Sequence, residues 1–159
     1  AEHFGERLPS MRKSRTTPSY DQFIVHMNRA AGQLAMTKTR FANPHGLTAE
    51  GHQTTASDLI RLAHQAMQLS TFRRYVATRQ HGCTLTDQSG VKRNVIWKNT
   101  NRLLAIEGYL GVKTGTTTAA GACLVSCSQR GNRQLLMVVL GASSSDARYT
   151  DSRNLFEPK

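Results

Sequence analysis

The pattern of apolar residues changes its period near the middle of this 159-residue chain. In residues 20–34 and again in residues 55–67, apolar side chains recur every three or four positions, the spacing of one face of an α-helix. In residues 109–114, 122–128 and 134–140, apolar and small residues instead form short runs, which is typical of strands. Helices followed by strands predict an α+β fold, with helices packed on an antiparallel sheet.

Local signals refine this expectation. Pro44 blocks a helix and Gly46 permits a positive φ, so residues 43–47 are expected to form a loop. The pair Gly131-Asn132 predicts a hairpin between the last two strands. That last strand is apolar throughout residues 135–140 and is therefore expected to be covered on both faces. The other expected features are a helix tail at 1–5, a surface connection at 8–19, short strands at 75–78, 83–86 and 94–97, core positions for Trp97, Leu103 and Leu104, and a closing helix at 145–156.

Charge and cysteine content narrow the possible functions. The chain has 21 Lys+Arg against 10 Asp+Glu, a net charge of +11. The basic residues are scattered along the chain and no nucleic-acid-binding module is recognisable, so no nucleic acid is expected as partner. The charge suits an acidic polymer or surface instead. Cys123 and Cys127 lie four residues apart in one expected strand, about 13 Å, which is too far for a disulfide.

The sharpest chemical signal is Lys113-Thr114-Gly115, at the end of an expected strand and followed by a hairpin. Three other blocks accompany it in a fixed order: Phe-Ile-Val-His-Met-Asn at 23–28, Thr-Arg-Phe-Ala-Asn-Pro-His-Gly-Leu at 39–47, and Asn-Thr-Asn-Arg-Leu-Leu at 99–104. Together these blocks resemble the serine-type D-alanyl-D-alanine carboxypeptidases of peptidase family S11, the low-molecular-mass penicillin-binding proteins. The similarity runs from residue 1 almost to residue 159.

The resemblance implies a β-lactamase/transpeptidase-like fold, an antiparallel sheet with flanking helices. Residues 1–159 would then be a partial catalytic domain whose N-terminal part is missing. The reaction it implies is acyl transfer, in which a serine attacks the peptide between two terminal D-alanines and water releases the acyl-enzyme.

The family uses three motifs: Ser-x-x-Lys, Ser-x-Asn and Lys-Thr-Gly. Ser10-Met11-Arg12-Lys13 matches the first motif literally, but it follows Pro9 in a basic loop and lies close to the 23–28 block. Ser152-Arg153-Asn154 matches the second motif, but it falls after Lys-Thr-Gly and is out of order. We therefore expect this chain to lack the nucleophile and to be inactive alone.

By the same resemblance, four consecutive residues and one arginine form the site. Lys113 places a cation beside the nucleophile region and the terminal carboxylate of the substrate, and Thr114 offers a hydroxyl donor to that carboxylate. Gly115 leaves room for a substrate backbone, and the backbone N–H of Thr116 matches the position that forms half of the oxyanion hole. Arg148 matches the arginine that helps bind the carboxylate of the leaving D-alanine, with a fork suited to bidentate contact.

The resemblance also implies partners and a location. The substrate would be a peptidoglycan pentapeptide ending in D-Ala-D-Ala, with β-lactams as inhibitors of the full-length enzyme, and the full-length protein would be exported to the periplasm or cell envelope. No cofactor is implied, and His45 and His52 lack a third metal ligand at useful spacing. Two alternatives stay open: a class A β-lactamase-like hydrolase, which shares Lys-Thr-Gly, and a non-catalytic peptidoglycan-binding remnant. Residues 43–47 either border the substrate cleft or form a purely structural turn.

Overall fold

The computed structural model describes residues 19–156 of the chain. Its elements are α2 (Ser19–Gln33), α3 (Ala56–Met67), α4 (Ser70–Ala77), β1 (Gln80–Thr86), β2 (Lys92–Lys98), the 3-10 helix η1 (Arg102–Ala105), β3 (Tyr109–Thr117), β4 (Gly121–Arg130), β5 (Arg133–Ala142) and α5 (Ser145–Phe156). The predicted α+β class is confirmed. The expected helix tail at 1–5 and, except for Ser19, the connection at 8–19 lie outside the described residues. None of the described helices is long and apolar enough to cross a membrane.

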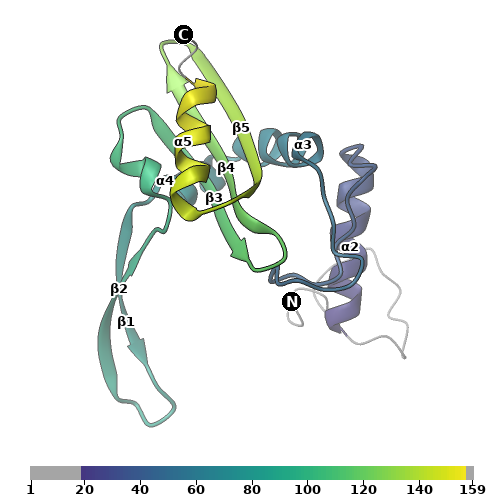
Figure 1. The fold of residues 1–159 in the computed structure, drawn as a ribbon. Coiled ribbons are helices and arrows are strands. Elements are labelled where there is room, and N and C mark those ends of the chain that lie inside the picture. Colours follow the sequence, from purple (N-terminus) through teal and green to yellow (C-terminus); the bar gives the residue numbers. More distant parts are fainter. Residues whose placement is uncertain (1–18, 157–159) are drawn as a thin grey trace.

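Strands β3, β4 and β5 form one antiparallel sheet in that order (Figure 1). The β4–β5 hairpin closes through the predicted residues, because Arg130 pairs with Arg133 and leaves only Gly131 and Asn132 between the strands. Gly131 has a φ of 54°, as a two-residue hairpin turn requires. Strand β3 therefore has one edge paired with β4 and, in the described part of the chain, one edge without a strand partner.

Helices cover both faces of this sheet (Figure 1). Helix α5 packs over β4 and β5 on one face, while α3 contacts β5 and α4 contacts β3 on the other. Neighbouring strand residues point to opposite faces, so each strand supplies two cores. The α5-side cluster contains Leu103, Tyr109, Leu124, Met137, Tyr149 and Phe156. The opposite cluster contains Met67, Val112 and Cys127, with Phe72, Val76, Leu110, Val125 and Leu136 packed against it.

One predicted strand is a helix. Residues 75–78 contain Tyr75 and Val76, which favour strands, but both residues belong to α4. Phe72 and Val76 are four positions apart, so a helix directs both side chains to the same side, against the core around Val112. This packing against the sheet outweighs the local strand preference.

The short strands predicted at 83–86 and 94–97 are confirmed as parts of β1 and β2, which pair with each other and not with the main sheet. The resulting two-stranded ribbon projects away from the body of the molecule (Figure 1). Trp97 lies on this ribbon and is 59% exposed, so its predicted core position is wrong, whereas Leu103 and Leu104 are buried as predicted. Among residues 19–156, no helix or sheet packs over the ribbon at Trp97, which leaves most of this side chain exposed.

The prediction that β5 is covered on both faces is also wrong. Met137 in its middle is buried, but Leu135 and Leu140 are 45% and 40% exposed. Strand β5 forms the second edge of the described sheet. Within the described residues, α3 and α5 pack on its faces, and they shield the middle of the strand better than the two flanking leucines.

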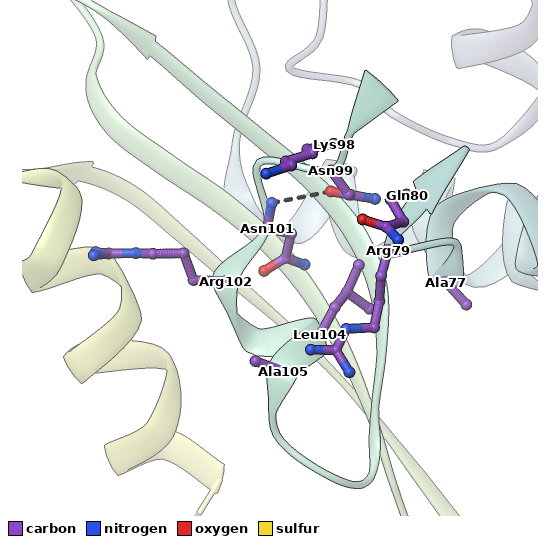
Figure 2. A pocket seen from close by; sticks show the side chains of 9 residues that line it. All are labelled: Ala77, Arg79, Gln80, Lys98, Asn99, Asn101, Arg102, Leu104 and Ala105. Carbon is purple, nitrogen blue, oxygen red and sulfur yellow. Dashed lines mark hydrogen bonds between the residues drawn. The ribbon is translucent and has the colours of Figure 1, made fainter. Parts of the chain in front are cut away.

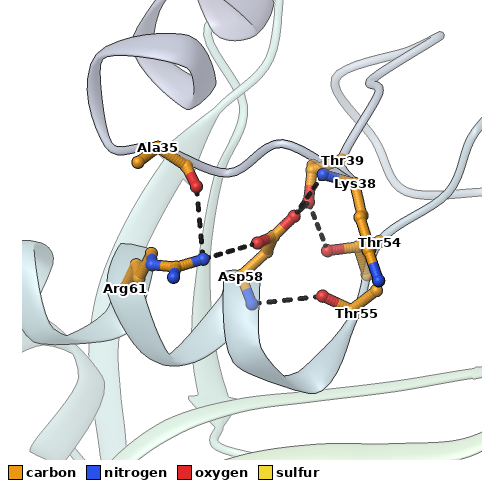
Figure 3. A network of polar contacts seen from close by, with 7 residues as sticks. All are labelled: Ala35, Lys38, Thr39, Thr54, Thr55, Asp58 and Arg61. Carbon is orange, nitrogen blue, oxygen red and sulfur yellow. Dashed lines mark hydrogen bonds and ion pairs between the residues drawn. The ribbon is translucent and has the colours of Figure 1, made fainter.

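A polar network ties the start of α3 to the segment after α2 (Figure 3). Thr55 is the N-cap of α3, and its hydroxyl accepts a hydrogen bond from the backbone N–H of Asp58. The Asp58 carboxylate is buried and accepts hydrogen bonds from the Lys38 backbone N–H at 2.9 Å and from the Thr39 hydroxyl at 2.8 Å. It also forms an ion pair with Arg61 at 3.0 Å. This one buried carboxylate thus connects α3 to the segment that follows α2.

We expect Asp58→Asn to destabilise the protein at neutral pH but much less in acid. Burial favours a raised pKa for Asp58, but hydrogen bonds from Thr39 and Lys38 and the charge of Arg61 outweigh it and hold the pKa below its ordinary value. A carboxyl group with a lowered folded pKa contributes stability above its unfolded pKa of about 3.9, and that stability is lost as the pH falls through the folded pKa.

Urea unfolding at a series of pH values checks this prediction. The gap in midpoint between wild type and Asp58→Asn should be constant between about pH 5 and 8 and should narrow below about pH 4. Asp151→Asn, which removes an exposed carboxylate of α5, should show no such pH-dependent gap. A gap for Asp58→Asn that stays constant through the acid range would contradict the proposed balance of hydrogen bonds and burial.

Candidate active site

The Lys113-Thr114-Gly115 triplet lies in the second half of the edge strand β3, which begins as predicted and continues to Thr117. Thr116 points towards α5, where Arg148 donates a hydrogen bond to its hydroxyl. Strand alternation places Thr114 on the same side and Lys113 and Gly115 on the opposite side. Lys113 is exposed, and its ammonium group contacts the carbonyl oxygen of Thr114. The cation is therefore available at the strand surface.

Gly115 stands at a position where the fold itself does not require glycine. A Cβ added there would meet no heavy atom within 4 Å, and its φ lies outside the left-handed region. Gly111 in the same strand differs, because a Cβ there would lie 2.9 Å from Cγ2 of Val76 and its φ is 135°. Fold packing thus accounts for Gly111, whereas Gly115 opens space beside the strand.

Arg148 is buried beneath this end of β3 and is 6% exposed. Its Nη1 donates to the carbonyl oxygen of Gly115 at 3.0 Å, the hydroxyl of Thr116 at 2.9 Å and the carbonyl oxygen of Cys123 at 3.3 Å. Its Nη2 donates to the Ser145 hydroxyl at 3.0 Å. Both terminal nitrogens of the Arg148 guanidinium group are thus hydrogen-bonded within the protein. A bidentate contact between Arg148 and a substrate carboxylate stays a prediction. Because the Thr116 hydroxyl oxygen accepts a hydrogen bond from Arg148, the hydroxyl group can still donate its own hydrogen to another acceptor.

Thr114 is held by a residue of the 99–104 block to which the sequence analysis gave no individual role. Its side chain is 8% exposed, and its hydroxyl shares a 2.7 Å hydrogen bond with the hydroxyl of Thr100. The Thr100 carbonyl in turn accepts a hydrogen bond from the Tyr149 hydroxyl at 2.9 Å. Thr114 therefore connects β3 to α5 through the 99–104 block. Donation from Thr114 to a carboxylate stays a prediction, since this hydroxyl already has a partner in the fold.

Positive charge accumulates at this end of β3. In the described part of the chain, no carboxylate forms an ion pair with Lys113 or with Arg148. The partners of Arg148 are carbonyl and hydroxyl oxygens, which carry no net charge. A buried cation is screened less than one in water, so its field extends to neighbouring atoms such as those of Thr116. Two cations without counter-ions favour an anionic ligand at this site.

The 23–28 block positions the 39–47 block. The side-chain amide of Asn28 donates to the carbonyl oxygen of Phe41 at 2.8 Å, and its Oδ1 accepts from the Phe41 backbone N–H, also at 2.8 Å. This pair of bonds satisfies both backbone groups of one residue and fixes where the following loop starts. Asn28, the last residue of the 23–28 block, therefore has a structural role.

The loop predicted at 43–47 is confirmed and reaches the end of β3. Asn43 is buried, and its Oδ1 accepts a hydrogen bond from the Gly46 backbone N–H at 2.8 Å. Gly46 has a φ of 77°, as expected from the sequence. Just after the loop, the Thr48 hydroxyl donates to the Thr117 hydroxyl at 3.0 Å. The loop is a structural turn, and it also lies beside the strand that carries the triplet.

Of the literal motif matches, the two that lie among the described residues serve local structure. Ser10 and its tetrad lie outside the described residues. A second literal Ser-x-x-Lys at 89–92 was missed from sequence; it forms the turn of the β1–β2 ribbon, where the Ser89 hydroxyl donates to Asp87 at 2.6 Å. Ser152 is fully buried on α5 and shares a 2.7 Å hydrogen bond with Ser126. The Ser-x-Asn match on α5 is therefore a packing feature.

The two histidines considered above take part in backbone contacts. Nδ1 of His45 accepts from the backbone N–H of Leu47 at 3.2 Å, and Nδ1 of His52 accepts from that of Ala42 at 3.1 Å. Within residues 19–156, no three His, Cys, Asp or Glu side chains gather in an arrangement that could hold a metal ion. The three cysteines are free thiols in the structure, and burial raises the pKa of the Cys127 thiol.

Comparison with known proteins identifies relatives along most of the chain. A family model described as D-alanyl-D-alanine carboxypeptidase matches residues 15–144. The D-alanyl-D-alanine carboxypeptidase of Streptomyces sp. strain K15 is 34% identical over 144 residues, which is 89% of this chain and 50% of the relative. The D-alanyl-D-alanine carboxypeptidase DacF of Bacillus subtilis is 34% identical over 131 residues, 82% of this chain and 33% of the relative.

Solved structures agree with the sequence comparison. The crystal structure of the Streptomyces K15 DD-transpeptidase matches with a TM-score of 0.84 at 33% identity, covering 93% of this chain and 57% of that protein. Penicillin-binding protein D2 of Listeria monocytogenes, solved in its cefotaxime-bound form, matches with a TM-score of 0.69 at 28% identity, covering 87% of this chain and 57% of that protein. The chain thus shares their fold and spans little more than half the length of these proteins.

Proposed function

The chain belongs to the D-alanyl-D-alanine carboxypeptidase family, and on that premise we propose that the full-length protein is a serine-type carboxypeptidase that removes the terminal D-alanine from peptidoglycan stem peptides through an acyl-enzyme. The observation that carries the proposal is the arrangement at the end of the edge strand β3. This strand carries an exposed lysine, a glycine with open space beside it, and a threonine whose hydroxyl accepts a hydrogen bond from a buried arginine of α5. Such an edge suits an extended peptide, which can lie along it as an added strand.

Each group has a defined task in this reaction. The Lys113 ammonium group attracts the substrate carboxylate and stabilises the charge that develops near the nucleophile. Gly115 admits the substrate backbone, and the Thr116 N–H donates to the oxyanion of the tetrahedral intermediate. Arg148 orients the Thr116 hydroxyl, so that its remaining proton can be donated to the carboxylate of the leaving D-alanine. Arg148 is in this sense a positioning residue.

The proposal extends to partners and location. A polymer bearing carboxylates fits the net charge of +11, and an envelope location would bring the protein to that polymer. β-Lactams are proposed as inhibitors, because the Listeria relative was solved in a cefotaxime-bound form and the residues at the end of β3 are of the kind that hold a carboxylate.

Labelling with a fluorescent penicillin tests the function. The full-length gene product should form a covalent adduct that survives denaturing electrophoresis, and a D-Ala-D-Ala peptide should compete with it. The 159-residue chain alone should stay unlabelled, because its literal Ser-x-x-Lys matches lie in a basic segment and in a ribbon turn. If the chain were labelled, Ser10→Ala would decide whether Ser10 is the nucleophile.

Two other outcomes would replace the proposal. Rapid turnover of nitrocefin by the full-length protein, without lasting label, would indicate a class A β-lactamase-like hydrolase. Binding of peptidoglycan peptides without either label or hydrolysis would indicate a non-catalytic binding remnant.

A further inference from the structure

One segment of the chain carries a large excess of positive charge. Residues 73–102 contain one carboxylate, Asp87, against seven basic residues: Arg73, Arg74, Arg79, Lys92, Arg93, Lys98 and Arg102. Asp87 lies in the turn of the β1–β2 ribbon, where its Oδ1 accepts backbone hydrogen bonds from Ser89 and Val91. The base of the ribbon, between α4 and η1, therefore carries positive charge with no carboxylate from its own segment.

A pocket of about 730 Å³ lies at the base of this ribbon (Figure 2). Its polar lining residues are Arg79, Gln80, Lys98, Asn99, Asn101 and Arg102, and none of its lining residues is acidic. Arg102 forms an ion pair with Asp146. Arg79 and Lys98 form no ion pair within the described residues, so their charges are available to an anionic ligand.

One amide at the wall of this pocket lacks a hydrogen-bond partner. Asn101 is 2% exposed, and its Oδ1 accepts from the Leu103 backbone N–H at 3.1 Å. Its Nδ2 has no partner among the described residues. Figure 2 shows this side chain beside Leu104, among the residues that line the pocket. A buried donor without an acceptor is rare in native proteins, and an acceptor oxygen from a ligand in the pocket would satisfy it.

A second pocket of about 680 Å³ adjoins the first and shares Gln80, Lys98 and Asn99 with it. Two aromatic residues line this second pocket, Tyr75 and Trp97, and they are 67% and 59% exposed. Exposed aromatic rings offer flat apolar faces to sugar rings, cations pair with carboxylates, and the exposed side-chain amide of Gln80 can bond hydroxyl and acetamido groups. We call these residues the ribbon-base surface: Tyr75, Arg79, Gln80, Trp97, Lys98 and Asn99.

We propose that the ribbon-base surface binds a carboxylate-bearing glycan, namely a stretch of peptidoglycan next to the stem peptide that is cut. This inference rests on the proposed function. Asn99 is followed by Thr100, whose hydroxyl bonds Thr114 of the catalytic strand at 2.7 Å, so the surface adjoins the back of the active-site strand. If the polymer contacts both the ribbon-base surface and the end of β3, the effective concentration of its stem peptides at the end of β3 rises.

The test measures binding of the full-length protein to purified insoluble peptidoglycan by co-sedimentation at low and moderate salt. The variant Arg79→Gln/Lys98→Gln should weaken binding about tenfold at low salt, because two cation–carboxylate contacts are lost. Trp97→Ala should weaken binding with little change in its salt dependence, because it removes an apolar contact. The matched control Arg133→Gln/Arg153→Gln removes two exposed charges from the β5 start and from α5 and should leave binding within about twofold.

The outcomes separate this inference from its rivals. An equal loss in the control variant would overturn it, since binding would then follow net charge alone. Tighter binding of single-stranded DNA than of peptidoglycan, abolished by the same variants, would also overturn it in favour of a nucleic-acid surface. Unchanged binding after the carboxylates of the peptidoglycan are converted to neutral amides would contradict the role assigned to Arg79 and Lys98.

Hydrolysis of a short D-Ala-D-Ala peptide gives an independent readout. The ribbon-base variants should keep wild-type kcat/KM on the short peptide and should lose activity only on the polymer, through a higher KM. Absence of short-peptide hydrolysis by the wild type would refute the proposed function, while the sedimentation assay would still report on the ribbon. Equal loss on the short peptide and the polymer would refute the ribbon-base proposal alone.

Discussion

Lys113→Ala is expected to lower the acylation rate of the full-length protein by a D-Ala-D-Ala peptide at least about 100-fold, the range found when one electrostatic contact to a transition state is lost. Lys113 is exposed on the edge strand and, within residues 19–156, forms no ion pair that the change would break. Its positive charge is therefore available to a carboxylate ligand. The effect should appear in kcat/KM for the peptide and in the rate of labelling by penicillin.

Two controls make the result specific. Thermal unfolding of Lys113→Ala should match wild type, because an exposed side chain without an ion pair contributes little to stability. Lys113→Arg keeps the charge and should retain part of the activity, although its planar fork does not reproduce the position of an ammonium group. Activity of Lys113→Ala within about threefold of wild type would remove the lysine from the mechanism.

The elements with strong periodic patterns could be predicted, and those fixed by distant contacts could not. Helix α5 begins and ends at the predicted residues, and the β4–β5 turn falls on the predicted pair. The strand predicted at 75–78 is helical because Val76 packs against a core supplied by residues more than thirty positions later. Local preference carries no information about such a contact. The exposed Trp97 likewise depends on the ribbon leaving the body of the protein.

The site shows the same division. The position of the triplet on a strand follows from its sequence context, and the open space at Gly115 agrees with the role that the family resemblance implied. The engagement of Arg148 with Thr116 and the 2.7 Å bond between Thr100 and Thr114 could not be predicted. Threonines are common surface residues, and only the fold reveals that these two hydroxyls meet. The charge excess of residues 73–102 is visible in the sequence, but only the fold shows that Arg74, Arg79, Lys98 and Arg102 line two neighbouring pockets.

The two glycines of β3 allow a sharper separation of activity from stability. Gly115→Val should fold normally, because a Cβ at this position meets no heavy atom within 4 Å and valine suits an extended strand. Its side chain would occupy the space where the substrate backbone is proposed to lie. We expect kcat/KM for a D-Ala-D-Ala peptide to fall by about 100-fold or more, as displacement of a substrate by one ångström can suffice for such a loss.

Gly111→Ala should show the opposite behaviour. Its Cβ would lie 2.9 Å from Cγ2 of Val76, and a φ of 135° is unfavourable for alanine, so the free energy of unfolding should fall by about 1–3 kcal/mol. Activity per folded molecule should be far less affected than in Gly115→Val. Chemical unfolding of both variants gives the free energy of unfolding. Active-site titration with penicillin gives the concentration of functional sites, from which the activity per folded molecule follows. If Gly115→Val lost stability as Gly111→Ala does, the glycine of the triplet would serve packing, and the space beside it would no longer support a substrate site.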